Sequence, residues 1–536
     1  MLGNHAVGLM APQRAGRIVN IATWHWASSR RTTPGTPIAH TGASQPIEPP
    51  MTTPSLRVAL VCARPFQADA SAGAPLGDQR FDMAQMARVL AAAGHQVEVL
   101  ARRDDPALPP VTRPWPGVRV QHLDAGPPCP ARQDRLRAFM PAFAEAARQA
   151  LHNRPPCDVL HADGYMAGWV GMALRLQLGL PLVTSFDALG LVGPDNQARD
   201  GRHLPVRIGI ERALAQQSDR VIATCAQDAQ ALAQLYGAPP GRVRTVPEGV
   251  DLQLFRPGDP LAARQRLGLP AGGFLVLQFS RPDQPDALAD TVEALALMAG
   301  RGDARLLLVG AGMADADGLP TAASSPLQAL AAARGVARQV QFADRPCGPE
   351  ALRDWYLAAD VLVSGSPHGA VCDAALQAMA CGCPVVRGCG GAAGDTLVDV
   401  ATGLLLAPGD PLAMAARLDL LRANPGLGNV VGRAGLDRVA RLHSWTQIGR
   451  QIADMHAELA TARAATPPQD SAPWPWAGTA PWPARRPAMP AGAPRSGALP
   501  PARGPARSSG QAPAQARPPS AALVQALAQA PGGFLP

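Results

Sequence analysis

The sequence predicts an α/β protein with two parallel β-sheets, each covered by helices on both faces. Short apolar strands alternate with helix-like segments, a pattern typical of parallel sheets. The alternation continues to Gly249 and starts again near residue 274, beyond "FRPGDP". A chain of 536 residues is also too long for one hydrophobic core. We therefore expect two Rossmann-like domains, joined near Leu254–Pro260.

The first series opens with an apolar strand, and a helix that Gly94 ends follows it. Its predicted strands are, in order, "LRVALVC", "QVEVLAR", "CDVLHAD", "LPLVTSFD", "DRVIATC" and "VRTVPEG". The second series has the strands "FLVLQFS", "ARLLLVGAG", "QVQFAD" and "DVLVSGS", with helices near 287–299, 327–334 and 350–359. The predicted domains are a tail at 1–54, a first domain at 55–255, a second at 256–445, a helix at 446–464 that crosses back to the first domain, and a tail at 465–536.

The net charge of +8 comes from the two tails. Residues 1–54 hold four arginines and one glutamate, and residues 465–536 hold six arginines and one aspartate, so the remaining body is formally neutral. A neutral body gives no basic groove, and no nucleic-acid partner is expected. Both tails are predicted to be disordered, since Pro, Ala, Gly and Ser bury no core. The arginines of the tails leave weak peripheral association with a membrane open. Met51 is an alternative start of translation.

Composition excludes two enzyme classes and indicates a compartment. The chain has no lysine, which rules out a P-loop lysine and a pyridoxal phosphate Schiff base. Its nine cysteines include no CxxC pair and no zinc-ribbon spacing, so no metal site is predicted. Free cysteines suit a reducing compartment, and the predicted localisation is cytoplasmic.

Five motifs carry a family resemblance. They are "GDQRFDMAQMARVLAAAGHQVEVL", "LHADGYMAGWVGMALRLQLGLPLVTSFDALG", "RIGIERALAQQSDRVIATCAQDAQALAQLYGAPPGRVRTVPEGVDLQLFRP", "LQAMACGCPVVRGCGG" and "TGLLLAPGDPLAMAARLDLL". Over residues 55–462 the chain resembles retaining GT-B glycosyltransferases of family 4. The resemblance implies transfer of a hexose from a nucleotide-sugar donor, with retention, to a glycan, a lipid-linked or a small-molecule acceptor. It implies no cofactor and no metal, because the nucleotide-sugar is a co-substrate.

The resemblance also places site residues in this sequence. It assigns donor binding to Gly77, Gln79, Arg281, His368, Gly369, Val371, Cys372 and Gln377, and catalysis to Arg281 and Asp187. Arginine suits the phosphate oxygens of a nucleoside diphosphate, and a carboxylate or amide suits sugar hydroxyls.

Several family positions are replaced here. Gly369 and Gln377 stand where the family has two glutamates, and Asp286 falls on or beside its lysine. Asp187 replaces a histidine, and Asp163 takes the last place of the family's "HAH". An alternative is therefore a catalytically degenerate GT-B pseudoenzyme that acts as a binding or scaffold partner. A remote alternative is an NAD(P)-dependent oxidoreductase, since "GCGGAAG" follows a strand, but no ribose-reading acid stands ~20 residues further on.

Overall fold

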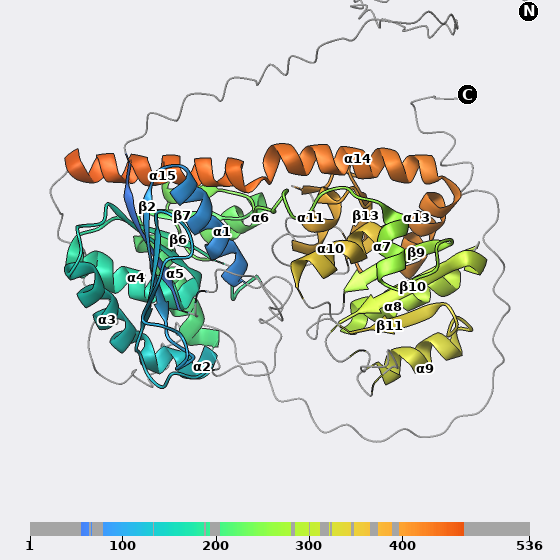
Figure 1. Ribbon diagram of the computed structural model, residues 1–536, viewed down its shortest axis with the longest axis horizontal. Coiled ribbons are helices and arrows are strands. Elements are labelled where there is room, and N and C mark those ends of the chain that lie inside the picture. Colours follow the sequence, from blue (N-terminus) through green and yellow to red (C-terminus); the bar gives the residue numbers. More distant parts are fainter. Residues whose placement is uncertain are drawn as a thin grey trace, which may run out of the picture. The chain divides into compact units, whose positions relative to one another are not determined.

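The computed structural model contains two parallel sheets, as the sequence predicts (Figure 1). The residues that it describes are 55–63, 66, 79–131, 133–186, 189–192, 204–279, 285–299, 301–310, 313, 321, 324–344, 348–364, 373–388 and 396–465. Both predicted tails lie outside these residues, apart from the final residue of the last helix. None of the described helices is both long and apolar enough to cross a membrane.

The first sheet has eight strands in the order β3-β4-β2-β1-β5-β6-β7-β8. Their bounds are β1 Arg57–Cys62, β2 Gln96–Arg102, β3 Val111–Thr112, β4 Val118–Leu123, β5 Val159–Asp163, β6 Leu182–Ser185, β7 Arg220–Ala223 and β8 Val243–Thr245. Every pair is parallel except β3 with β4. The sequence did not predict β3 or β4, because the Arg, Gln and His of "VRVQHL" interrupt the apolar pattern of β4.

Helices cover both faces of this sheet. They are α1 Gln79–Ala92, α2 Gln133–Leu136, α3 Met140–His152, α4 Gly164–Leu178, α5 Leu204–Gln217 and α6 Ala226–Gln234. Alternate residues of a strand point to opposite faces. Val58 and Leu60 accordingly pack into the core that α1 closes, while α4 covers the other face and contacts β5.

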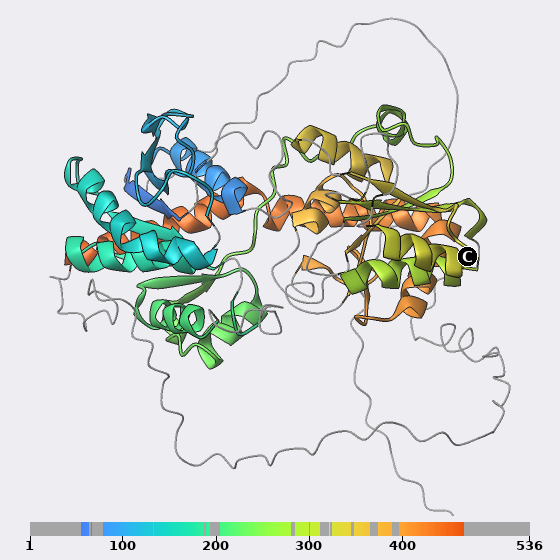
Figure 2. The same cartoon turned by 90° about the horizontal axis from the view of Figure 1, so that it is seen from below.

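The second sheet is entirely parallel, in the order β11-β10-β9-β12-β13-β14. Its strands are β9 Phe274–Phe279, β10 Ala304–Val309, β11 Val340–Ala343, β12 Val361–Ser364, β13 Val385–Gly388 and β14 Leu404–Leu406. Its helices are α7 Pro260–Arg266, α8 Pro285–Leu297, α9 Ser325–Ala333, α10 Pro349–Ala358, α11 Asp373–Ala380, α13 Pro411–Ala423 and α14 Pro425–Leu442. Two buried clusters lie on its two faces, and Figure 2 shows helices on both sides of the strands.

The last helix, α15 (Trp445–Ala465), packs on the first sheet although it follows the second in the chain (Figure 1). Trp445, Ile448 and Ile452 belong to the same buried core as β1 and β2. A side chain at Gly249 would come within 2.7 Å of the Trp445 ring, so only glycine fits below it. A buried contact of 3.2 Å joins His161 Nδ1 on β5 to His456 Nε2 on α15.

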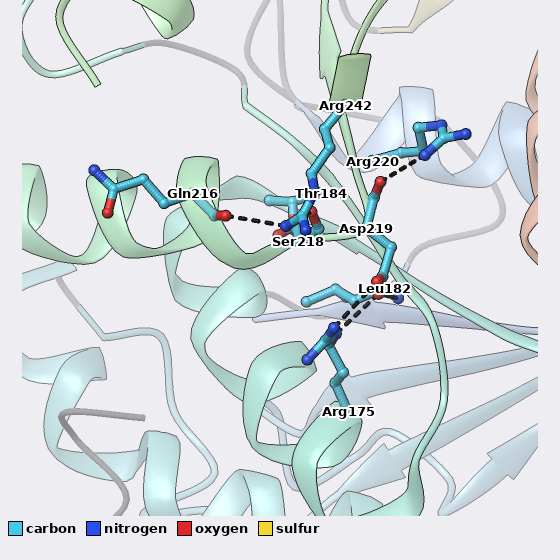
Figure 3. A network of polar contacts seen from close by, with 8 residues as sticks. All are labelled: Arg175, Leu182, Thr184, Gln216, Ser218, Asp219, Arg220 and Arg242. Carbon is cyan, nitrogen blue, oxygen red and sulfur yellow. Dashed lines mark hydrogen bonds and ion pairs between the residues drawn. The ribbon is translucent and has the colours of Figure 1, made fainter. Parts of the chain in front are cut away.

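A polar network fixes the amino ends of β6 and β7 (Figure 3). The Asp219 carboxylate accepts bonds from Arg175 Nε at 2.8 Å, Arg175 Nη2 at 3.1 Å and the Leu182 N–H at 2.8 Å. Arg242 donates to the carbonyl oxygens of Gln216 and Ser218. The C-terminal ends of α4 and α5 are thereby tied to the first residues of β6 and β7 and to the start of β8.

Candidate functional site

The strand order identifies where ligands bind in each sheet. Open parallel sheets bind ligands outside the carboxyl ends of strands, at the point where the order reverses. The order reverses between β1 and β5 in the first sheet and between β9 and β12 in the second. The first of these points lies at Cys62 and Asp163, and the second at Phe279 and Ser364.

Three side chains of the first sheet meet at its reversal point. Register aligns Cys62, Asp163 and Ser185 on neighbouring strands. The Ser185 hydroxyl donates to Asp163 Oδ1 at 2.5 Å. Burial, followed by the Asp163 charge, raises the pKa of the Cys62 thiol far above its usual range. The thiol is therefore no nucleophile, and the half-buried Asp163 carboxylate is the group that can accept a bond from a ligand hydroxyl.

A buried carboxylate anchors the segment after β6. Glu211 on α5 accepts bonds from the Gly190 N–H at 3.0 Å, Arg207 Nε at 2.7 Å and the Tyr236 hydroxyl at 2.8 Å. The Tyr236 oxygen in turn accepts the Leu191 N–H at 2.8 Å. Burial raises the pKa of Glu211. This cluster fixes the backbone at Gly190 and Leu191, three and four positions after the predicted catalytic residue Asp187.

Most of the predicted site residues lie outside the described part of the chain. These are Gly77, Asp187, Arg281, His368, Gly369, Val371 and Cys372, and of Gln79 only the backbone is described, as the first residue of α1. Their roles stay predictions. Chain order relates two of the predicted segments to described strands. Residue 281 comes two positions after the end of β9, and residues 365–372 join β12 to α11. Because β9 and β12 are paired neighbours, both segments leave the second sheet at its reversal point.

Gln377 is the one predicted residue whose side chain is described. Its Oε1 accepts a bond from the Tyr356 hydroxyl at 2.9 Å. The Tyr356 ring is buried, with the rings of Phe255 and Phe279 at 6.0 and 5.5 Å between centroids. Tyr356 therefore holds the carboxamide oxygen, and the Nε2 group has no hydrogen bond within the described residues. The amide is left to donate to a ligand oxygen, where a glutamate would accept.

Arg387 was not predicted as a site residue. It is the penultimate residue of β13, only 1% exposed, and lies opposite Ser364 in the register. By strand alternation it points to the face that α11 covers, together with Val385. The signal in the sequence was a charge inside the apolar run "PVVRG". Arg387 places a buried positive charge at the carboxyl edge of the second sheet.

No group of three or more His, Cys, Asp or Glu side chains could hold a metal ion within the described residues. At the carboxyl edge of the second sheet, the described groups include the Gln377 amide, the Ser364 hydroxyl and the buried Arg387 guanidinium. Such groups suit polyols and phosphates.

Comparison with known proteins agrees with this arrangement. The family model "Glycosyltransferase Family 4" matches residues 83–254, and "Glycosyl transferases group 1" matches residues 273–424. D-inositol 3-phosphate glycosyltransferase 1 of Catenulispora acidiphila is 34% identical over 379 residues, covering 70% of this chain and 89% of the relative. The chain belongs to glycosyltransferase family 4. The resemblance predicted from the sequence is confirmed.

Solved structures place this glycosyltransferase in the GT-B fold. Sucrose-phosphate synthase from Thermosynechococcus elongatus superposes with a TM-score of 0.65 at 29% identity, covering 76% of this chain and all of that one. Anabaena Alr3699/HepE, solved with UDP and glucose, superposes with a TM-score of 0.55 at 16% identity, covering 75% of this chain and all of that one. The second likeness concerns the fold alone.

Proposed function

We propose that this glycosyltransferase transfers a hexose from a nucleoside diphosphate sugar to a small phosphorylated polyol, with retention at the anomeric carbon. One observation carries the donor assignment. The two segments that contain Arg281 and His368–Cys372 follow β9 and β12, the neighbouring strands at the reversal point of the second sheet. Gln377 stands on the helix that follows the second segment.

The reaction needs positive charge where the leaving diphosphate gains negative charge. Arg281 is proposed to contact the diphosphate, since a guanidinium fork matches phosphate oxygens. The free N–H groups and dipole at the start of α11 add attraction for an anion. The Gln377 amide, held by Tyr356, is proposed to donate to a ribose hydroxyl oxygen.

The acceptor proposal rests on the relatives. One is named for D-inositol 3-phosphate and the other for sucrose-phosphate, so both names include a phosphorylated polyol or sugar. On this chain, the Asp163 carboxylate at the reversal point of the first sheet is proposed to accept a bond from an acceptor hydroxyl. Retention follows from the family resemblance and needs no protein nucleophile.

Calorimetry with UDP, and separately with ADP, tests the donor site. Arg281→Ala is expected to weaken binding by about ten- to a hundredfold, because a hydrogen bond to a charged group contributes about 1.5–3 kcal/mol. Gln377→Ala should cost less, about 0.5–1.5 kcal/mol. Asp286→Lys should tighten binding by adding a cation. Arg433→Ala, an exposed arginine on α14, is the matched control. Unchanged affinity in Arg281→Ala would place the diphosphate elsewhere.

A transfer assay tests turnover. D-inositol 3-phosphate is offered with UDP-glucose or ADP-glucose, unphosphorylated inositol serves as the control acceptor, and NMR reports the anomeric configuration of the product. Product with the donor's configuration supports the proposal. Nucleotide binding without transfer to any acceptor would instead indicate a pseudoenzyme, and binding of NAD(P) alone an oxidoreductase.

A further inference from the structure

The first sheet carries a cavity of about 410 Å³ at its amino edge, opposite the edge that holds Asp163. It opens between the first residues of β1, β2 and β4 and the turn that precedes β5. Its volume is within the roughly 300–1,000 Å³ usual for small-molecule sites. Family ligands bind at the carboxyl edge of such sheets, so this cavity is a separate place in the fold.

The walls of the cavity are strongly basic. Four arginines, Arg57, Arg113, Arg119 and Arg154, face a single carboxylate, that of Glu98, which leaves a formal balance of +3. Glu98 is already engaged, with Arg119 Nε at 2.9 Å and Arg154 Nη2 at 3.7 Å. It also accepts a bond from the amide of Gln121. The one lining carboxylate therefore neutralises only part of this charge.

Two of these arginines have guanidinium groups without a partner in the described part of the chain. Among the residues that the structure describes, the guanidinium groups of Arg57 and Arg113 make no hydrogen bond or ion pair. The Nε atoms of Arg57 and Arg154 are buried and have no acceptor. A buried donor without a protein acceptor is costly and needs water or a ligand oxygen as its partner.

Helix ends at this edge do not cancel the excess. Helices α1 and α3 end just before β2 and just before the Arg154 turn, and each C-terminus carries about half a negative charge. Together they offset about one of three positive charges, and the Asp158 carboxylate, which accepts the Arg57 backbone N–H at 2.7 Å beside the cavity, offsets a further one. The balance stays positive, which favours an anion.

We propose that this cavity binds a small phosphorylated molecule. Guanidinium groups form paired hydrogen bonds to phosphate oxygens, and several converging arginines favour phosphate over a single carboxylate. Trp115 supplies one wall and is itself positioned by an edge contact with Phe66, at 6.4 Å between ring centroids. The proposal does not depend on the donor or acceptor assignments above.

A residue of the last helix, α15, also contacts the wall of the cavity. Arg463 on α15 donates to the carbonyl oxygen of Cys157, a residue that lines the cavity, at 3.3 Å. Cys157 is buried, and burial raises the pKa of its thiol to about 11, so it stays neutral beside the arginines. The positive charge of the cavity is therefore not reduced by a thiolate.

Calorimetry with inorganic pyrophosphate as the probe, on the full chain saturated with UDP so that the proposed donor site is already filled, tests the proposal. The double variant Arg57→Gln/Arg113→Gln is expected to weaken pyrophosphate binding at this site by about tenfold or more. Arg433→Gln, which removes an exposed arginine on α14, should leave it unchanged. The double variant should bind UDP as the parent does, which separates this cavity from the donor site.

Three results would overturn the proposal. The parent binds no pyrophosphate; the double variant binds it as tightly as the parent; or citrate binds more tightly than pyrophosphate, which would make the site a carboxylate site. Arg113→Glu guards against a folding defect, because Arg113 is exposed. That variant should melt at the parent's temperature and still lose pyrophosphate affinity.

Discussion

The two sheets bury their polar side chains in different places. The first sheet buries them both inside its strands, at Glu98, Gln121 and His161, and at the last two positions, at Arg102, His122, Thr184 and Ser185. The second sheet buries Gln278, Ser364 and Arg387, each the last or penultimate residue of its strand.

The difference is one of position, since Gln278 in the second sheet also has a protein partner, the Ala287 carbonyl oxygen at 3.0 Å. In the first sheet the buried polar groups have partners inside the protein: Arg102 Nε donates to the Ala125 carbonyl at 2.9 Å, and Thr184 bonds to Ser218 at 2.9 Å. In the second sheet they gather at the carboxyl ends, where ligands bind in parallel sheets. Substitutions of internally paired polar groups in the first domain, such as Glu211 and Asp219, should therefore change mainly stability, and those at the carboxyl edge of the second sheet should change mainly binding.

The largest stability loss is expected from Glu211→Ala. It leaves Arg207 and the Gly190 N–H without their buried acceptor, and breaking a buried ion pair costs about 3–5 kcal/mol. Urea unfolding followed by circular dichroism measures it. Glu145→Ala on the exposed face of α3 is the control and should leave the free energy of unfolding nearly unchanged. A Glu211 variant as stable as the control would break the contrast between the sheets.

A pH dependence is expected from His161 and His456. Burial lowers the pKa of His161 from 6.5 to about 4, and lowers that of His456 well below 6.5. Below pH 6.5 the unfolded chain therefore binds more protons than the folded one, and the free energy of unfolding falls as the pH falls. His161 alone should remove about 2 kcal/mol between pH 6.5 and 5.

A double variant isolates this pH effect. His161→Gln/His456→Gln should flatten the dependence of unfolding on pH in that range, while His152→Gln, at the exposed end of α3, should not change it. A parent protein whose unfolding free energy is constant from pH 6.5 to 5 would contradict the buried neutral pair.

Asp219→Ala is expected to cost about 1.5–3 kcal/mol, since it removes a partly exposed acceptor of two guanidinium bonds and one backbone N–H. Thermal unfolding is the measurement, and Asp437→Ala, in an exposed pair on α14, is its control. Nucleotide affinity should not change. A loss of affinity at equal stability would mean that the amino edge of the first sheet acts on binding.

The smallest effect on stability is expected from Tyr356→Phe, about 0.5–1.5 kcal/mol for one hydrogen bond. Nucleotide affinity should also fall, because Gln377 loses the bond that orients its amide. Phe255→Leu, next to the same ring, is a packing control. If Tyr356→Phe leaves affinity unchanged, Gln377 is not positioned for a ligand.

Much of the fold could be predicted because apolar alternation is local. The segment "LRVALVC" predicts a strand at 56–62, and β1 is Arg57–Cys62. Strand β4 was missed because Glu98 and α3 bury its polar residues, and no local pattern records those partners. The Glu211 cluster joins residues 21 to 25 positions apart, and Gln377 meets Tyr356 across two helices. Such contacts follow from tertiary packing, which spacing in the sequence does not specify.

The position of α15 has a consequence for synthesis on the ribosome. The two buried clusters of the second domain extend to Leu421 and Val439, so this domain can close once α14 has emerged. The first core must wait for Trp445, Ile448 and Ile452, which emerge after the whole second domain. Ile452 comes 390 residues after Cys62, the last residue of β1. At about 5–20 residues per second, the delay between β1 and its cover is about 20–80 s. During that time the apolar face of β1 and β2 has no final cover, so the domain that emerges first is the last to be completed.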